Sequence, residues 1–225
     1  MIGGEPEPAA NELIRELTEL RPVPLVPEIL LHQGADELVG LWERMEAAMG
    51  RSGLDPPFWA FAWAGGQALA RYLLDNPQEV TGRRVIDLAS GSGLVAIAAA
   101  KAGAALVSAY DTDPLAAAAI TLNARVNGAA VRAVRADILD SAGLPSPGTD
   151  LLLIADAFYE RGLAHRVMRF ADRGHARGVA VLLGDPGRTY LPRGRLAPLA
   201  AYDVAGLGAV EDSDVKRTTI WALHR

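Results

Sequence analysis

Apolar and polar positions separate two kinds of segment along the chain from about residue 84 onward. Short apolar runs, which are typical of buried strands, are followed by longer segments with the apolar spacing of helices. Strands that alternate with helices favour a parallel sheet with helices on its faces. The pattern therefore predicts strands near 84–89, 105–111, 130–136, 149–155 and 178–184, helices near 93–102, 114–127 and 160–173, and a final antiparallel pair at 200–204 and 215–223.

The chain before these segments follows a different pattern. Amphipathic spacing predicts helices at 11–20 and 35–49, and the prolines of Arg21–Pro27 break any helix between them. We expect this region to form an accessory layer. The sequence thus predicts an N-terminal helical extension over residues 1–57, followed by one α/β domain with a seven-stranded sheet over residues 58–225.

The composition favours one large core and argues against several classes of protein. With 225 residues, 50% of them hydrophobic, the chain is long enough for one substantial domain. A net charge of −5 without a basic block argues against a nucleic-acid surface, and no apolar run approaches the roughly 20 residues of a membrane helix. The chain has no cysteine and its four histidines lack ligand spacing, so we expect no metal site. Its acidic, proline-rich start resembles neither a secretory signal nor a mitochondrial presequence, which favours a cytoplasmic protein.

The segment Val85–Ala98 is typical of a strand, a glycine turn and an apolar helix, the order that builds a nucleotide-type cofactor site. A dinucleotide turn has the pattern G-x-G-x-x-G, whereas this turn has the pattern D-x-A-x-G-x-G, with alanine at position 89. An acid at the strand end would repel a pyrophosphate but suits the ammonium and sulfonium groups of S-adenosylmethionine. We therefore expect that cofactor, and the candidate binding residues of the turn are Asp87, Ser90, Gly91 and Gly93.

Two further acids follow the next two predicted strands. Asp111 lies 20 residues after Gly91, the spacing at which a carboxylate can accept hydrogen bonds from both ribose hydroxyls of a nucleoside. Asp137 closes the following strand and is placed to meet an adenine amino group. The alternative for such acids is a helix cap, and Asp113 fits that role because Pro114 follows it. We therefore assign Asp111 to the ribose and Asp113 to structure.

The fourth predicted strand ends in a carboxylate and two aromatic residues, where a transferred methyl group would emerge. A lysine acceptor with an ordinary pKa of about 10.4 must lose a proton, which costs about 4.6 kcal/mol at pH 7. An anionic Asp156 would raise that pKa, so we expect it to accept a hydrogen bond from the amine rather than to act as a base. Phe158 and Tyr159 would form the walls of the acceptor site, and the alternative for both is a place in the core.

The segment Asp55–Phe58 favours a rival hypothesis. Its D-P-P-F sequence is similar to the motif with which amino-methyltransferases of nucleic acids grip an extruded base. That motif is expected after the fourth strand or well ahead of the cofactor turn, whereas here it lies about 30 residues before Asp87. Its position therefore argues against base methylation.

Several longer motifs are more specific than the cofactor turn. They include Gly65–Leu69 and Arg71–Pro77 ahead of the turn, and Ala119–Asn123 and Gly184–Arg188 after it. With these motifs the chain, over about residues 25–223, resembles the lysine methyltransferases of the electron transfer flavoprotein beta subunit, a branch of the seven-strand protein methyltransferases. The resemblance implies a Rossmann-like, class I methyltransferase sheet.

The resemblance also implies roles for single residues. Trp63 and Ala155 would line the cofactor pocket, with a core position as the alternative for Trp63. Asp156 and Tyr159 would be the catalytic residues of a D-x-x-Y element found in this branch. Arg188 would meet acidic residues of the substrate, although its segment is equally typical of a simple turn.

The implied activity is transfer of a methyl group from S-adenosylmethionine, which leaves S-adenosylhomocysteine, to lysines of the flavoprotein beta subunit and, in bacterial relatives, of a ribosomal stalk protein. The start of the chain and its Ala-, Arg- and Gly-rich composition favour a bacterial version. We expect a monomer, because a closed sheet gives no reason for an oligomer. We also expect that the protein binds neither nucleic acid nor membranes. The alternatives are a methyltransferase of small molecules or nucleic acids, and a module that binds the cofactor without turnover.

Overall fold

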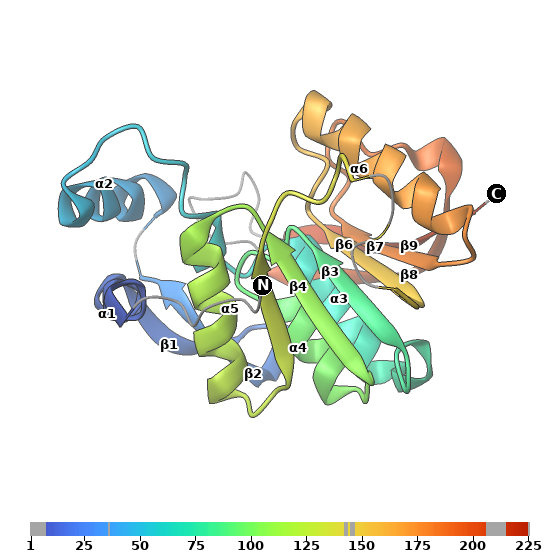
Figure 1. Ribbon diagram of the computed structural model, residues 1–225, viewed down its shortest axis with the longest axis horizontal. Coiled ribbons are helices and arrows are strands. Elements are labelled where there is room, and N and C mark those ends of the chain that lie inside the picture. Colours follow the sequence, from blue (N-terminus) through green and yellow to red (C-terminus); the bar gives the residue numbers. More distant parts are fainter. Residues whose placement is uncertain (1–7, 36, 142–143, 145–146, 206–214, 225) are drawn as a thin grey trace.

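The computed structural model describes residues 8–35, 37–141, 144, 147–205 and 215–224. A seven-stranded sheet with the order β5-β4-β3-β6-β7-β9-β8 forms its centre (Figure 1). Strands β3 to β7 pair in parallel, and β9 runs antiparallel to both β7 and β8. The strands are β3 (Arg84–Leu88), β4 (Leu106–Asp111), β5 (Val131–Arg135), β6 (Leu151–Ala155), β7 (Ala180–Asp185), β8 (Leu196–Ala205) and β9 (Val215–Leu223). The sheet and its final antiparallel pair confirm the predicted fold.

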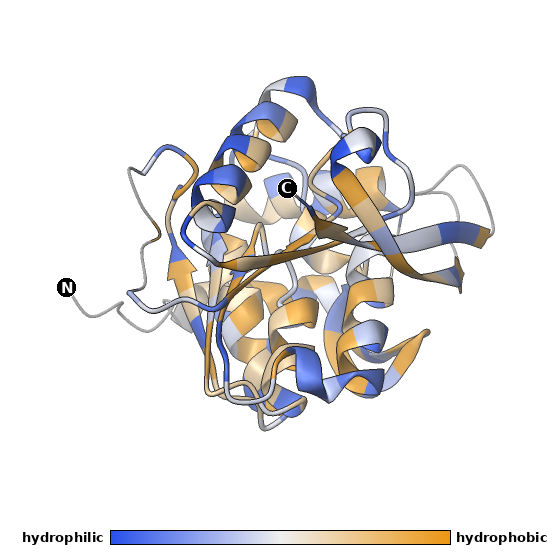
Figure 2. Cartoon of the chain, turned by 90° about the vertical axis from the view of Figure 1, so that its right-hand side faces the viewer, coloured by the Kyte–Doolittle hydropathy of each residue, from blue (hydrophilic) through white to orange (hydrophobic). Residues whose placement is uncertain are grey.

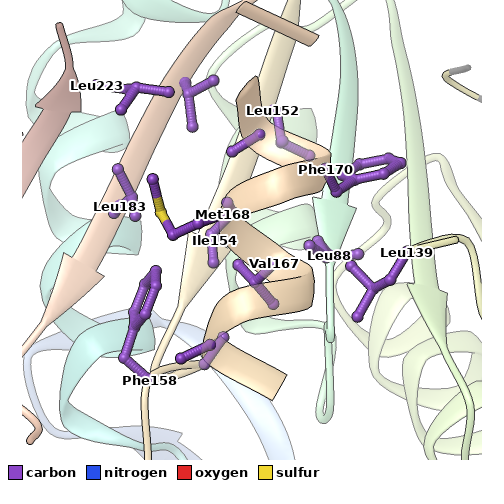
Figure 3. Packing of buried hydrophobic residues seen from close by; sticks show 14 of the residues in the cluster. Leu88, Leu139, Leu152, Ile154, Phe158, Val167, Met168, Phe170, Leu183 and Leu223 are labelled. Carbon is purple, nitrogen blue, oxygen red and sulfur yellow. The ribbon is translucent and has the colours of Figure 1, made fainter. Parts of the chain in front are cut away.

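Helices cover both faces of this sheet, because successive side chains of each strand point to opposite faces. On one face Leu151 and Leu153 pack into the cluster that includes α3 and α4. On the other face Leu152 and Ile154 pack against α6, as Figure 3 shows in close-up. The helices are α3 (Ala64–Asp75), α4 (Leu94–Lys101), α5 (Pro114–Val126) and α6 (Arg161–His175). The central strands β3, β4, β6 and β7 are therefore buried on both sides, which explains why they are mostly apolar.

The turn between β3 and α4 requires glycine at a definite position. Gly93 has a φ of 85°, and a Cβ atom there would lie 3.2 Å from the Cα atom of Ile120 on α5. Ala89 also has a positive φ of 52°. This conformation is energetically unfavourable for any residue that has a side chain. The turn thus brings α4 close to α5 and leaves Ala89 in a strained conformation at the end of β3.

The N-terminal region corrects one prediction. The two expected helices are present as α1 (Pro8–Leu17) and α2 (Leu38–Met49), but between them β1 (Thr18–Val23) and β2 (Val26–Gly34) form an antiparallel hairpin. The predicted helix break around Arg21–Pro27 is therefore the turn region of a hairpin, and the extension is not only helical. The prolines are tolerated because a two-stranded ribbon has outer edges where no backbone N–H is required.

Side chains of α5 hold the hairpin against the domain. The Asn123 side-chain oxygen accepts a hydrogen bond of 2.8 Å from the backbone N–H of His32, and that of Asn127 accepts one of 3.0 Å from Leu30. These two amides occupy positions i and i+4 on one helix face. They accept hydrogen bonds from backbone N–H groups on the edge of β2 that does not pair with β1. Figure 1 shows the N-terminal elements beside α5.

Three short 3-10 helices complete the chain that the structure describes. They are η1 (Phe58–Ala60), η2 (Pro77–Glu79) and η3 (Arg193–Arg195). In Figure 2 helices at the surface carry both hydrophilic and hydrophobic residues, as expected of elements that cover a core. Helix α4 differs, because its residues 94–99 are all buried and apolar. Among the described residues, no helix is long and apolar enough to cross a membrane. The acidic N-terminal segment noted in the sequence lies outside the described residues.

Candidate active site

A cavity of about 640 Å³ opens at the carboxyl ends of the parallel strands. Ligands of open α/β sheets bind at this edge, so its position agrees with the fold. The wall is built from the ends of β3, β4 and β6, from α6 and from the η1 region. Its residues include Asp55, Phe58, Trp59, Trp63, Ala89, Gly91, Tyr110, Asp111, Asp137, Ile138, Leu139, Ala155, Asp156, Tyr159, Arg166 and Arg188.

Asp111 and Asp137 both line the cavity, as the sequence predicts. One oxygen of Asp111 accepts a hydrogen bond of 2.8 Å from the Gly91 N–H, which ties the end of β4 to the turn after β3. Asp137 forms an ion pair of 2.6 Å with Arg166 on α6, and the hydrogen bond from this guanidinium lowers the pKa of Asp137. Burial has the opposite effect on Asp111, whose pKa is raised. Both acids therefore stand in the wall as hydrogen-bond acceptors with different surroundings.

Three residues of the turn are not in the cavity wall. Asp87 is 1% exposed, and one of its oxygens accepts hydrogen bonds from the Ser90 hydroxyl at 2.5 Å and the Ala96 N–H at 3.1 Å. Burial raises the pKa of Asp87 to about 7. Ser90 and Gly93 also lie outside the wall, whereas Ala89 and Gly91 form part of it. The structure thus places Asp87 beneath the turn, where it holds the start of α4, rather than facing a ligand.

Asp156 lies at the end of β6, with a φ of 54° and a side chain only 10% exposed. One oxygen forms an ion pair of 2.8 Å with the Arg188 guanidinium, and the other accepts a hydrogen bond of 2.9 Å from the Gly66 N–H in the first turn of α3. Burial raises the pKa of Asp156, while the charge and hydrogen bond of Arg188 lower it. Both oxygens of Asp156 are therefore engaged before any substrate arrives, which agrees with the expectation that it is a poor base.

Aromatic rings form the mouth of the cavity near this ion pair. The ring of Phe58 makes edge contacts with Trp63 and Tyr159, at centroid distances of 5.7 and 5.9 Å. The Arg188 guanidinium lies 5.7 Å from the ring centre of Trp63, within cation–π range. Tyr159 is 50% exposed. The mouth thus has aromatic walls, with Arg188 between Trp63 and Asp156.

Phe158 does not belong to this mouth, which corrects its assignment to the substrate site. It is 1% exposed and packs in the core between the sheet and α6, near Met168 and Leu183 (Figure 3). The D-x-x-Y segment turns at Asp156, so its two aromatic residues point to different environments. The alternative noted in the sequence, a core position, therefore holds for Phe158 and not for Tyr159.

The sequence indicated some of the wall residues only weakly or not at all. Asp55 and Phe58 belong to the D-P-P-F segment, which was noted and set aside because of its position in the chain. Arg166 gave no signal, because an arginine on an amphipathic helix is usually a surface residue. Asp185 is buried, and one of its oxygens accepts hydrogen bonds of 2.7 Å from the backbone N–H groups of Gly187 and Arg188. A simple turn was one of the two alternatives predicted for this segment.

The residues of the cavity fit S-adenosylmethionine. Its ribose hydroxyls and adenine amino group need hydrogen-bond acceptors, and its adenine ring needs apolar surroundings; the Asp111 and Asp137 carboxylates are acceptors in the cavity wall. Tyr110, Ile138 and Leu139 form apolar wall beside these acids. Gly91 itself forms part of the cavity wall, so its backbone is within reach of a bound ligand. Among the described residues, no group of three or more His, Asp or Glu side chains could hold a metal ion.

Comparisons with known proteins agree with this geometry. A family model described as ribosomal protein L11 methyltransferase (PrmA) matches residues 67–154. The L11 methylase structure from Lactobacillus delbrueckii subsp. bulgaricus has a TM-score of 0.51 and 21% identity, over 73% of this chain and 80% of that chain. Magnesium protoporphyrin IX methyltransferase from Synechocystis, solved with bound S-adenosylhomocysteine, has a TM-score of 0.51 and 13% identity, over 71% and 82% of the two chains. These structures show a shared methyltransferase fold.

The sequence relatives are more specific. The electron transfer flavoprotein beta subunit lysine methyltransferase of Mus musculus is 34% identical over 99% of this chain and 88% of its own length. The protein of the same name from Homo sapiens is 34% identical over 97% of this chain and 83% of its own length. Because these relatives are animal proteins, they give no support to a bacterial source. The match over nearly the whole chain shows that this protein belongs to the family of electron transfer flavoprotein beta subunit lysine methyltransferases.

Proposed function

We propose that this protein transfers methyl groups from S-adenosylmethionine to lysine side chains of the electron transfer flavoprotein beta subunit. The observation that carries the proposal is one cavity with two different ends. One end offers the Asp111 and Asp137 carboxylates beside apolar residues, and the other has aromatic walls around the Arg188–Asp156 ion pair. The first end suits a nucleoside cofactor, and the second suits a long, flexible side chain with an amine at its tip.

The cofactor end is built from strand ends and from the turn that they hold. We propose that Asp111 accepts hydrogen bonds from the ribose and that Asp137 faces the adenine, with Gly91, Trp63 and Ala155 close to the ligand. Asp87, Ser90 and Gly93 support the site indirectly, because they shape the turn and the start of α4. S-adenosylmethionine supplies an electrophilic methyl group bound to a positively charged sulfur.

The acceptor end must receive a lysine in its neutral form. Desolvation between the Trp63 and Tyr159 rings disfavours the ammonium form and so lowers the lysine pKa. An isolated Asp156 anion would raise that pKa again, but Arg188 balances its charge at 2.8 Å. The lysine proton leaves to water, and an Asp156 oxygen accepts a hydrogen bond from the remaining N–H. Held in this way, the amine nitrogen would be aimed at the methyl group that S-adenosylmethionine supplies. The new carbon–nitrogen bond would replace the methyl–sulfur bond, whose electron pair would leave with S-adenosylhomocysteine, and orientation would supply much of the rate enhancement.

The relatives' names support a protein substrate, and the family model supports a second candidate. Relatives that match almost the whole chain are named for the flavoprotein beta subunit, whereas the model for L11 methyltransferases matches residues 67–154. The longer match favours the flavoprotein. The ribosomal protein L11 is the second candidate substrate.

The direct test incubates the purified protein with labelled S-adenosylmethionine and either the flavoprotein or L11. We expect methylated lysine in the flavoprotein beta subunit after hydrolysis and amino-acid analysis. Asp111→Ala should weaken cofactor binding about tenfold or more in calorimetry, because the loss of a charged hydrogen-bond acceptor costs about 1.5–3 kcal/mol. Label that appeared in neither protein would contradict the proposal.

We also propose that residues 1–57 form an accessory extension to a methyltransferase domain over residues 58–225, and that the protein acts as a monomer. Every strand of the seven-stranded sheet follows residue 58, which supports this boundary. The hairpin packs on α4 and α5 through Ile29 and Leu31. The extension therefore covers two helices of the domain and leaves the cavity to be formed mainly by later residues.

A further inference from the structure

Helix α6 carries positive side chains that have no assigned function. Its sequence holds four arginines against one aspartate, in a chain whose net charge is −5. Arg166 pairs with Asp137 and Asp140, and Arg173 donates to the Leu139 carbonyl. These two side chains are therefore occupied in holding the segment after β5 and contribute little to an outer surface.

Three other residues of α6 form a separate stripe. Arg161, His165 and Arg169 are exposed and lie at positions i, i+4 and i+8, which places them on one side of the helix. Within the part of the chain that the structure describes, none of the three has an ion pair or a side-chain hydrogen bond. We call these three residues the α6 stripe. Its positive charge is thus available to a partner.

The stripe does not serve the stability of its own helix. A cation at the start of a helix faces the positive end of the helix dipole, and Arg161 is the first residue of α6. The Glu160 side chain caps this end by accepting hydrogen bonds of 2.7 Å from Gly162 and Leu163. An unpaired arginine next to that cap is an electrostatic cost to the fold, so a role outside the fold explains it better.

The stripe also begins at the mouth of the cavity. Tyr159, which lines the mouth, precedes Arg161 by two residues, and Leu163 and Val167 on a neighbouring side of α6 line the cavity itself. With a rise of about 1.5 Å per residue, the stripe runs about 12 Å away from the mouth. That length matches about four residues of an extended peptide, at about 3.3 Å each.

We infer that the α6 stripe is a docking surface for an acidic segment of the substrate protein, adjacent in sequence to the lysine that enters the cavity. The inference rests on the proposed function, and charge complementarity selects the partner. The two arginines of the stripe make a short positive strip on an acidic protein, whereas a nucleic-acid site needs a wider basic face that follows the phosphate backbone. An acidic peptide of a few residues fits the strip in both length and sign.

The test uses two short fluorescent peptides that share a central lysine. One carries about four glutamates on one side of the lysine, and the other carries glutamines at the same positions. Binding is measured by anisotropy at low and high salt for the protein, for Arg161→Glu/Arg169→Glu, and for the control Lys101→Glu/Arg132→Glu. The control reverses the same charge at exposed positions on α4 and β5, away from the stripe.

The protein should bind the glutamate peptide about tenfold more tightly than the glutamine peptide, and high salt should remove most of that preference. The stripe variant should lose the preference and the control should keep it. A stripe variant that keeps the preference, a control that loses it equally, or tighter binding of a single-stranded RNA of equal charge would each overturn the inference.

Methylation of the same peptides separates this inference from the proposed function. Charge-selective binding without transfer would support the docking surface and contradict the proposed lysine methylation. Transfer to both peptides at equal efficiency would support the proposed function and overturn the docking surface.

Discussion

Asp156 is the residue on which the acceptor end of the cavity depends. Its two oxygens join β6 to Arg188 and to the first turn of α3, and its left-handed backbone turns the chain so that Tyr159 faces the cavity. Residues with positive φ that are not glycine cost free energy and are found at functional sites. The identity of Asp156 thus affects both the charge and the shape of the mouth.

Replacing this carboxylate tests its role. Asp156→Asn leaves Arg188 without its ion-pair partner, so the acceptor amine loses its position and methylation should fall about 100-fold, the effect of a misplacement of about 1 Å. Cofactor affinity, measured by calorimetry, should stay within about threefold. The exposed pair Asp203–Arg217 supplies the control, since Asp203→Asn should leave turnover unchanged. Full methylation by Asp156→Asn would remove Asp156 from the mechanism.

Asp185 holds the turn that carries Arg188, and its effect on the free energy of unfolding depends on pH. Burial raises the pKa of Asp185 from 3.8 to about 6, and its second oxygen is buried without a hydrogen-bond partner among the described residues. A carboxyl with a raised folded-state pKa destabilises the fold when it is ionised. That penalty is absent below about pH 4, grows as the pH rises toward 6, and is complete above it.

Asp185→Asn should remove this penalty, because the amide oxygen can still accept from the Gly187 and Arg188 N–H groups. The free energy of unfolding of the variant, relative to the unchanged protein, should rise by about 2 kcal/mol between pH 4.5 and pH 7. Urea denaturation across this range measures the difference. A difference that stays constant with pH would show that Asp185 is not a buried, destabilising charge.

At the scale of elements, the site depends on how closely α3 approaches β7. A Cβ atom on Gly65 would lie 2.3 Å from the Gly184 carbonyl oxygen and 2.5 Å from an Asp156 oxygen. This contact keeps the start of α3 within reach of the Asp156 carboxylate. The Gly65–Leu69 and Gly184–Arg188 motifs, which were informative in the sequence, are thus the two sides of one contact.

Gly65→Ala should therefore be strongly destabilising, by about 3 kcal/mol, because backbone atoms on both sides must move. Gly66→Ala is the matched control in the same turn, since its Cβ atom would meet nothing closer than 3.7 Å. Thermal unfolding should show a large loss for the first variant and little change or a small gain for the second. Equal stability of the two variants would contradict this account of the helix contact.

The same scale shows why the hairpin escaped prediction. Its prolines suggested only a break between helices, and a proline inside a central strand would have been incompatible with a sheet. In the structure Pro22 lies in a two-stranded ribbon opposite Leu30, and Asn127 on α5 satisfies the Leu30 N–H. Leu30 and Asn127 lie 97 residues apart in the chain, so no local sequence pattern contains the signal for this arrangement.

At the scale of the whole molecule, the parallel sheet was predictable because its central strands β3, β4, β6 and β7 are short, mostly buried apolar runs. The convergence of Asp111, Asp137 and Asp156 was predictable for the same reason, since parallel strands end at one edge. The directions of individual side chains were not predictable from the sequence. Asp87 faces the start of α4, and Phe158 faces the core.

Charge across the molecule could be counted from the sequence but not placed. Arg166 and Arg188 are both scattered arginines in the sequence, and in the structure each neutralises an acid of the cavity. Two of the five aspartates in the cavity wall are therefore balanced by arginines. This balance allows a neutral amine to exist beside Asp156, which is the central claim of the proposed mechanism.

The most direct test of the claim that this cavity methylates lysine is mass spectrometry. A cell lysate would be treated with the purified protein and isotopically labelled S-adenosylmethionine, with Asp156→Asn as the control. We predict labelled methyl groups on lysines of the electron transfer flavoprotein beta subunit, and almost none with the variant. Label found only in RNA or in small metabolites, or label on lysine that is independent of Asp156, would contradict the account.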